Sequence, residues 1–88
     1  MEKREVTIPN RLGLHARAAV KLVSVCMRYT ASVTLLANGR RANGRRLIAL
    51  LMLSAAMGAR VSIEASGPDE KRAVVAIERL ITNGFGEG

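Results

Sequence analysis

The sequence predicts an α+β fold: a four-stranded, mostly antiparallel sheet with three helices on one face, in the order β-α-β-β-α-β-α. Short segments that alternate polar and apolar residues are separated by segments whose apolar residues recur at helical spacing. An Asn-Gly pair at 38–39 indicates a tight hairpin. The length of 88 residues and the hydrophobic content of 49% allow one small domain over residues 1–88.

The first strand and the first helix are indicated by their patterning. Residues 5–8 alternate polar and apolar side chains and stop at 9–10, a Pro-Asn pair, as is typical of a short half-buried strand before a loop, and we expect this strand to cover residues 3–8. The helix is expected to begin at or just after His15 and to end at 29–30. Its predicted apolar stripe consists of Ala16, Ala19, Val20, Val23, Cys26 and Met27.

A hairpin and a short apolar segment follow. Residues 33–37 and 40–42 are the predicted strands on either side of the turn at 38–39. The run 47–53 fits either a buried strand or a helix, and its Leu, Met and Ala residues favour a helix that stops at Gly58.

The last strand and the last helix complete the predicted fold. Residues 60–65 alternate again and end at 66–68, a Ser-Gly-Pro turn. We expect Asp69 to cap the next helix and the Asn-Gly pair at 83–84 to end it. The inward residues are predicted to be Val61, Ile63 and Ala65 on the strand and Val74, Ile77, Leu80 and Ile81 on the helix.

Positive charge is concentrated in the first two thirds of the chain. Residues 1–60 hold eleven Lys and Arg against two acidic residues, a net charge of +9, whereas residues 61–88 hold three against five, a net charge of −2. This imbalance serves solubility or general affinity for nucleic acid, or it marks a docking face for an acidic partner or a phosphate; the charge alone does not decide between them. Tyr29 and Phe85 are the only aromatic residues, which argues against an RNA-binding module that stacks bases on exposed rings.

Cysteine and histidine usage excludes several classes of protein. The single Cys26 cannot form an internal disulfide, and one Cys with one His offers no zinc ligand set, so we expect no metal and no cofactor. The longest uncharged apolar run, 47–56, is too short to cross a bilayer. We therefore expect a cytoplasmic protein without membrane insertion, and a monomer.

The segment Gly13-Leu14-His15-Ala16-Arg17 contains the only histidine, at a junction between a loop and a helix. A helix start gathers unpaired N–H groups, which disfavour an imidazolium and favour a bound anion. His15 could therefore act as a neutral nucleophile for a phosphoryl group, held by the amides of Ala16 and Arg17 and by the Arg17 guanidinium. Alternatively, His15 only caps the helix and Arg17 is a solvated charge.

This segment, preceded by a short strand and Pro9-Asn10-Arg11-Leu12, resembles the active-site signature of the histidine-containing phosphocarrier protein (HPr) family of the bacterial phosphotransferase system. The resemblance covers the whole chain and includes the segments 6–8, 13–17, 38–39, 47–53, 67–70 and 83–87. It implies an open-faced β-sandwich and a phosphoryl carrier rather than an enzyme. It also implies transfer from the phosphohistidine of enzyme I, charged by phosphoenolpyruvate with enzyme I's own metal, to Nδ1 of His15. The next acceptor would be a histidine of an enzyme IIA-type protein, in sugar uptake or in nitrogen and carbon regulation.

Two positions depart from the family pattern, and one run suggests a branch. Ala18 stands where the family usually has proline, and in a first helical turn this change should only loosen the helix start. Arg46 stands where many relatives have a regulatory serine, so a kinase cannot act there. The run 47–53 looks closer to the nitrogen-related paralogue, NPr, than to sugar-uptake members.

The resemblance also implies a docking surface beside His15. We expect Leu50, Leu53 and Met57 to be core residues, and Cys26 to be a small core residue without a redox role. The predicted docking residues are an apolar centre and a basic rim, suited to transient recognition of acidic partners. They are Val20, Leu47, Ile48 and Leu51, with Arg17, Lys21, Arg45 and Arg46.

Two other classes of function fit the sequence less well. The run 40–46 contains four arginines that would bind nucleic acid phosphates without sequence preference, but it lacks adjacent aromatic residues and any recognition-module signature. We expect no nucleic acid partner. A metal-dependent hydrolase is weaker still, because one His and scattered carboxylates offer no ligand set.

Overall fold

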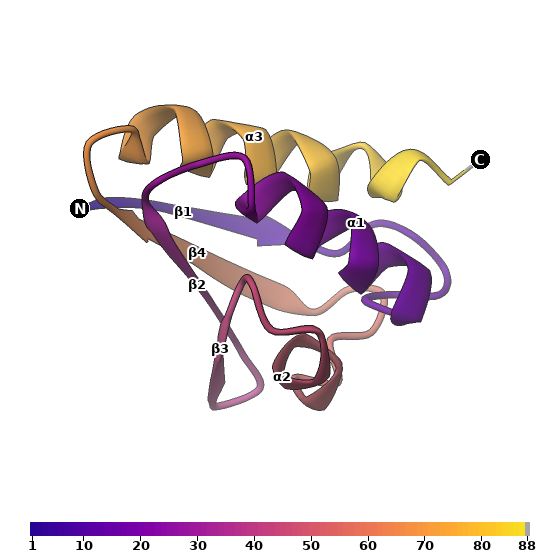
Figure 1. Cartoon of the computed structure of the whole chain (residues 1–88). Helices are drawn as coiled ribbons and strands as arrows, with labels where there is room; N and C mark the ends of the chain where they lie inside the picture. Colours follow the sequence, from indigo (N-terminus) through magenta and orange to yellow (C-terminus); the bar gives the residue numbers. More distant parts are fainter. Residues whose placement is uncertain (88) are drawn as a thin grey trace.

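A computed structural model describes residues 1–87 and confirms the predicted order of elements (Figure 1). The elements are β1 (Glu2–Thr7), α1 (Ala16–Cys26), β2 (Ser32–Ala37), β3 (Arg40–Asn43), α2 (Leu47–Met52), β4 (Arg60–Ser66) and α3 (Glu70–Thr82), followed by a 3₁₀ turn, η1 (Gly84–Gly86). Within this described part of the chain, no helix has both the length and the apolar character needed to cross a membrane.

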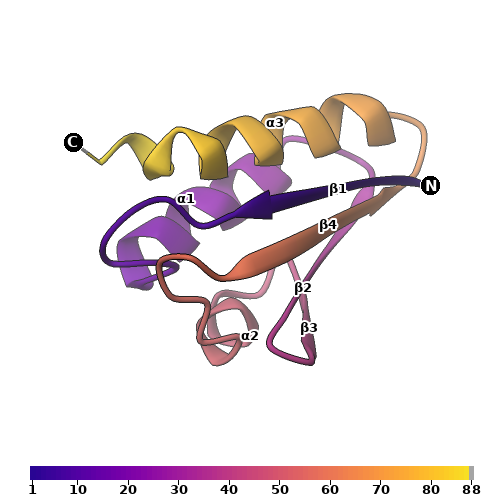
Figure 2. The same cartoon turned by 180° about the vertical axis from the view of Figure 1, so that it is seen from behind.

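The sheet has the strand order β1-β4-β2-β3, and all three strand pairs are antiparallel. At the hairpin between β2 and β3, Asn38 and Gly39 have φ values of 53° and 74°, the left-handed conformation that a tight two-residue turn requires. The helices α1 and α3 lie side by side over one face of the sheet (Figure 1), and the view from behind brings β1 and β4 to the front (Figure 2). The fold is therefore an open-faced β-sandwich, as predicted.

The core is aliphatic and lies between the sheet and the helices. Val61, Ile63 and Ala65 of β4 are at most 1% exposed, which confirms their predicted inward direction. Cys26 is fully buried, and burial raises the pKa of its thiol to about 11, so it is a packing residue rather than a reactive one. Phe85, the only phenylalanine, belongs to η1, and its fully buried side chain anchors this turn to the core.

The predicted stripe of α1 was wrong in part. Ala16, Val20 and Met27 are exposed and Val23 is half-buried. The buried residues of the helix are Ala18, Ala19, Leu22 and Cys26. Two consecutive alanines give α1 a narrow, flat surface against its neighbours, which include both α2 and α3. The buried face of α1 is therefore rotated about the helix axis relative to the predicted face, which was centred on larger apolar residues.

The second helix is shorter than expected. It ends at Met52 rather than at Gly58, and Met57, predicted to be in the core, is 58% exposed. Gly58 N–H donates to the Ile8 carbonyl oxygen at 2.8 Å, and Ile8 N–H donates to Ala59 at 2.9 Å. These bonds draw the segment after α2 toward the end of β1. Leu50 and Leu53 are buried as predicted.

Around the start of α3, two predictions need correction. Asp69 occupies the N-cap position, but its side chain does not cap the helix. Its carboxylate instead accepts hydrogen bonds from the backbone N–H groups of Thr30 and Ala31, at 2.9 and 2.8 Å. Asp69 thus ties the loop between α1 and β2 to the start of α3. Leu80, predicted in the buried stripe, is only half-buried, and Ala73 is buried instead.

Candidate functional site

The loop between β1 and α1 is held in place before it reaches His15. Leu14 N–H donates to the Ala55 carbonyl oxygen at 2.8 Å. Gly13 has a φ of 65°, and a Cβ at this position would lie only 2.6 Å from the same oxygen, so the close approach requires glycine. The loop is therefore fixed against the segment that follows α2, and the position of His15 depends on that contact.

His15 is the N-cap residue of α1, in extended conformation, as predicted. Its side chain makes no capping hydrogen bond, which contradicts the alternative that His15 serves only as a cap. The first helical amide with a carbonyl partner is that of Ala19, which donates to the His15 oxygen at 2.8 Å. Within residues 1–87, the amides at 16–18 have no backbone acceptor, so the helix start offers N–H groups to an anion.

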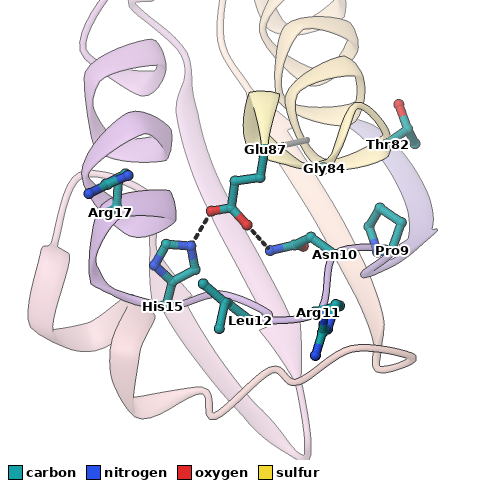
Figure 3. A pocket seen from close by; sticks show the side chains of 9 residues that line it. All are labelled: Pro9, Asn10, Arg11, Leu12, His15, Arg17, Thr82, Gly84 and Glu87. Atoms are coloured by element: carbon teal, nitrogen blue, oxygen red, sulfur yellow. Dashed lines mark hydrogen bonds and ion pairs between the residues drawn. The ribbon is translucent and has the colours of Figure 1, made fainter.

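An open hollow of about 800 Å³ lies between this loop and the end of the chain (Figure 3). It is lined by Pro9, Asn10, Arg11, Leu12, His15, Arg17, Thr82, Gly84 and Glu87. Arg17 extends from the first turn of α1 and lies on the α1 side of the imidazole ring, opposite Glu87. The structure thus brings together His15, Arg17 and the amides predicted for the site.

Glu87 is a site residue that the sequence analysis did not identify. Its Oε2 contacts Nε2 of His15, and its Oε1 accepts a hydrogen bond from Nδ2 of Asn10 at 2.9 Å (Figure 3). The His15 and Glu87 side chains are 24% and 21% exposed. The two residues are 72 positions apart in the sequence. The one sequence feature that points to their contact is the lone Phe85, because burial of this side chain brings the tail back to the core.

The surroundings of Glu87 favour its ionised form. The hydrogen bond with His15 lowers the pKa of the Glu87 carboxyl most, and the hydrogen bond with Asn10 and the positive charge of Lys21 lower it further. Partial burial of the carboxyl opposes this shift. Lys21 Nζ donates to the Phe85 carbonyl oxygen at 2.6 Å. Lys21, predicted as a docking residue, therefore also holds the tail that carries Glu87.

The predicted docking residues differ in exposure. Val20 and Ile48 are 53% and 69% exposed, on α1 and α2, two helices in contact. Leu47 and Leu51, expected to be exposed, are half-buried against the core. Arg46, the N-cap residue of α2, is exposed.

The arginines of the segment 40–46 are largely tied to their own chain. Arg40 donates to the Met52 carbonyl oxygen at 3.0 Å, and Arg45 donates to that of Tyr29 at 2.5 Å. Arg41 lies 4.0 Å from a carboxylate oxygen of Glu64.

Comparison with known proteins gives one consistent result. Residues 2–83 match the family described as "PTS HPr component phosphorylation site". The chain is 42% identical over 88 residues to the phosphocarrier protein HPr of Cupriavidus necator, covering 100% of this chain and 99% of the relative. It is 46% identical over 85 residues to the phosphocarrier protein NPr of Proteus mirabilis, covering 96% and 94%. A crystal structure of HPr from Thermoanaerobacter tengcongensis superposes with a TM-score of 0.95 at 28% identity, covering 100% and 99%.

Proposed function

Because this chain belongs to the HPr family of phosphocarrier proteins, we propose that it carries the phosphoryl group on His15. The donor is the phosphohistidine of enzyme I, which obtains its phosphoryl group from phosphoenolpyruvate. The acceptor is a histidine of an enzyme IIA-type protein. In each step one P–N bond breaks as another forms, so the chain returns unchanged.

The observation that supports this proposal is the position of His15 at a helix start whose first amides lack backbone acceptors. A phosphoryl group on Nδ1 would lie toward these N–H groups and toward Arg17, which faces the same side of the ring. Charge-assisted hydrogen bonds from a guanidinium stabilise both the developing charge and the resident phosphate. One residue thus accepts the group, and its neighbours on α1 hold it.

The absence of the usual proline at position 18 is compatible with this role. The Ala18 amide has no backbone acceptor in residues 1–87, so a proline would remove a donor that makes no helical bond here. The Ala18 side chain is fully buried, and a helix forms from Ala16 onward without the proline.

For partner recognition we propose the exposed Val20 of α1 and Ile48 of α2, two helices in contact, together with the exposed Arg46 at the start of α2. Exposed apolar side chains next to a permanent positive charge suit a transient complex with an acidic partner, since charge raises the encounter rate and apolar contact supplies affinity. Relatives named HPr and NPr are both similar to this chain, at 42% and 46% identity. The nitrogen-regulatory branch stays a prediction from the run 47–53.

The test is phosphorylation of the purified protein by enzyme I, magnesium and phosphoenolpyruvate. We expect one phosphate per chain, labile in acid and stable in alkali, because a phosphohistidine has these properties. The control is His15→Ala, which removes the only imidazole and should take up no phosphate. Equal labelling of wild type and His15→Ala would overturn the proposal.

A further inference from the structure

We infer that Glu87 is a positioning residue for His15, which keeps the imidazole proton on Nε2 and leaves the electron pair of Nδ1 free to receive a phosphoryl group. The inference extends the proposed function to a residue from the far end of the chain. It depends on the contact between Glu87 Oε2 and His15 Nε2, and on how the carboxylate is held there.

The Glu87 carboxylate is fixed from two directions. Asn10 Nδ2 donates to Glu87 Oε1 and to the Gly13 carbonyl oxygen, both at 2.9 Å, so both N–H bonds of that amide are used. The backbone before Glu87 is anchored by the buried Phe85, whose carbonyl oxygen accepts the hydrogen bond from Lys21 at 2.6 Å. The carboxylate is therefore held at the ring rather than extended into solvent.

The chemistry of the pair determines which nitrogen is free. An ionised carboxylate only accepts hydrogen bonds, so the nitrogen that contacts it must carry the hydrogen. A neutral imidazole has one N–H, and with Nε2 protonated the electron pair is on Nδ1. Figure 3 shows Nδ1 on the side of the ring that faces α1, where Arg17 and the unpaired amides lie.

The same arrangement suits the phosphorylated state. As the Nδ1–P bond forms and the P–N bond of the donor breaks, Nε2 keeps its hydrogen throughout. The ring gains positive charge, and the adjacent Glu87 carboxylate stabilises that charge. No proton has to enter or leave the ring during transfer.

The inference can be tested on the unphosphorylated full-length chain, because His15 is the only histidine. With ¹⁵N-labelled histidine at a pH where the ring is neutral, NMR should show wild type as the Nε2–H tautomer. In Glu87→Gln we expect the opposite preference. The hydrogen bond to the Gly13 carbonyl oxygen keeps Asn10 Nδ2 directed as a donor, so the side-chain oxygen of the new glutamine would accept from it. The NH₂ group of that glutamine would then face Nε2 of His15, which would have to accept a hydrogen bond.

Two further variants serve as controls. Glu87→Asp retains a carboxylate and should keep the Nε2–H tautomer at least in part. Glu5→Gln makes the same charge change at an exposed residue of β1 and should leave the tautomer as in wild type. When enzyme I transfers the phosphoryl group to this protein, we expect Glu87→Gln to lower kcat roughly 10- to 100-fold, as loss of a supporting carboxylate does in other sites. The KM of enzyme I for this protein should change little.

An Nδ1–H tautomer in wild type, or an equal tautomer ratio in wild type and Glu87→Gln, would overturn the inference. The NMR readout does not depend on phosphorylation. If wild type takes up no phosphate, the proposed function fails, while the tautomer measurement still decides the role of Glu87.

Discussion

Lys21 of α1 donates a hydrogen bond to the carbonyl oxygen of Phe85, 64 positions later in the chain, at 2.6 Å. The ammonium group thereby fastens η1 to the first helix, next to the start of that helix. The tail that carries Glu87 is thus held by a side chain as well as by the buried Phe85 ring.

Replacement of Lys21 by methionine should loosen the tail without unfolding the protein. A hydrogen bond contributes about 1 kcal/mol to local stability, so its removal would raise the population of the locally open tail roughly fivefold. We expect that increase in hydrogen exchange at the amides of Gly86 and Glu87, which donate to Asn83 and Gly84. Amides in the middle of α3 are the internal control, and an unchanged exchange rate at Gly86 would contradict the anchoring role.

Arg17→Ala should slow phosphoryl transfer by about 10- to 1,000-fold, because loss of one charge-stabilising donor commonly has an effect of this size. Arg17 is exposed, so the free energy of unfolding should barely change. Rapid-quench transfer from phosphorylated enzyme I measures the rate, and urea unfolding measures stability. Arg11→Ala, at another arginine of the same hollow, is the matched control.

Arg46→Glu should weaken association with enzyme I or the acceptor, mainly through a slower on-rate. The effect should shrink as salt rises, because screening weakens the attraction between exposed charges. Arg46→Ser should fold normally and show a smaller effect. Stopped-flow measurements at low and high ionic strength test this, and equal on-rates at low salt would place Arg46 outside the docking surface.

Asp69 should make the stability of the fold sensitive to acid. The hydrogen bond from Thr30 N–H, and then that from Ala31, lower the pKa of its carboxyl below the ordinary value. Because the pKa of Asp69 is lower in the folded state than in the unfolded state, its ionised form stabilises the fold. This contribution to the free energy of unfolding is complete above the unfolded-state pKa, about 3.9, and is lost as the pH falls through the folded-state pKa. Asp69→Asn should be less stable at neutral pH and lose less stability on acidification. If urea unfolding gave the same difference in stability between wild type and Asp69→Asn at every pH, this role would be contradicted.

Gly13→Ala should destabilise the protein and displace His15. A left-handed φ for alanine costs on the order of 1 kcal/mol, and the added Cβ would lie 2.6 Å from the Ala55 oxygen and 2.8 Å from Ala56 Cα. Transfer activity should fall together with stability. Gly39→Ala is the matched control, since its φ is also positive, but among residues 1–87 no atom outside Gly39 and its two chain neighbours lies within 4 Å of the added Cβ. A loss no larger than in Gly39→Ala would show that the contact with Ala55 is unimportant.

Most of the fold could be predicted because the strand patterns and turn residues are local signals. Residues 60–65 alternate, and Asn38 and Gly39 form a turn whose conformation few other pairs adopt. The errors have tertiary causes. Met57 is an apolar residue of the type found in cores, but the backbone hydrogen bond from Gly58 to Ile8 holds this segment as a loop, and the Met57 side chain is exposed. Asp69 could cap a helix by its position, but two amides from a distant loop bind its carboxylate.

The candidate site divides in the same way. His15 and Arg17 are neighbours in sequence, so a helix start alone places them together. Glu87 and Asn10 come from the two ends of the chain and meet only through packing of the tail. No local pattern distinguishes Glu87 from a solvated carboxylate, which is why the sequence analysis missed it.

The strand order has a consequence for biosynthesis. Within residues 1–87, β1 is an edge strand that pairs with β4 alone, and its Glu2 lies opposite Ala65. During translation, therefore, β1 emerges from the ribosome long before β4 has been made. The β2-β3 hairpin and α1 can form early because their contacts are local. β1 must stay unpaired until Arg60–Ser66 has been synthesised, and Val6 and Ile8, which are buried in the folded protein, lack their β4 neighbours throughout that interval.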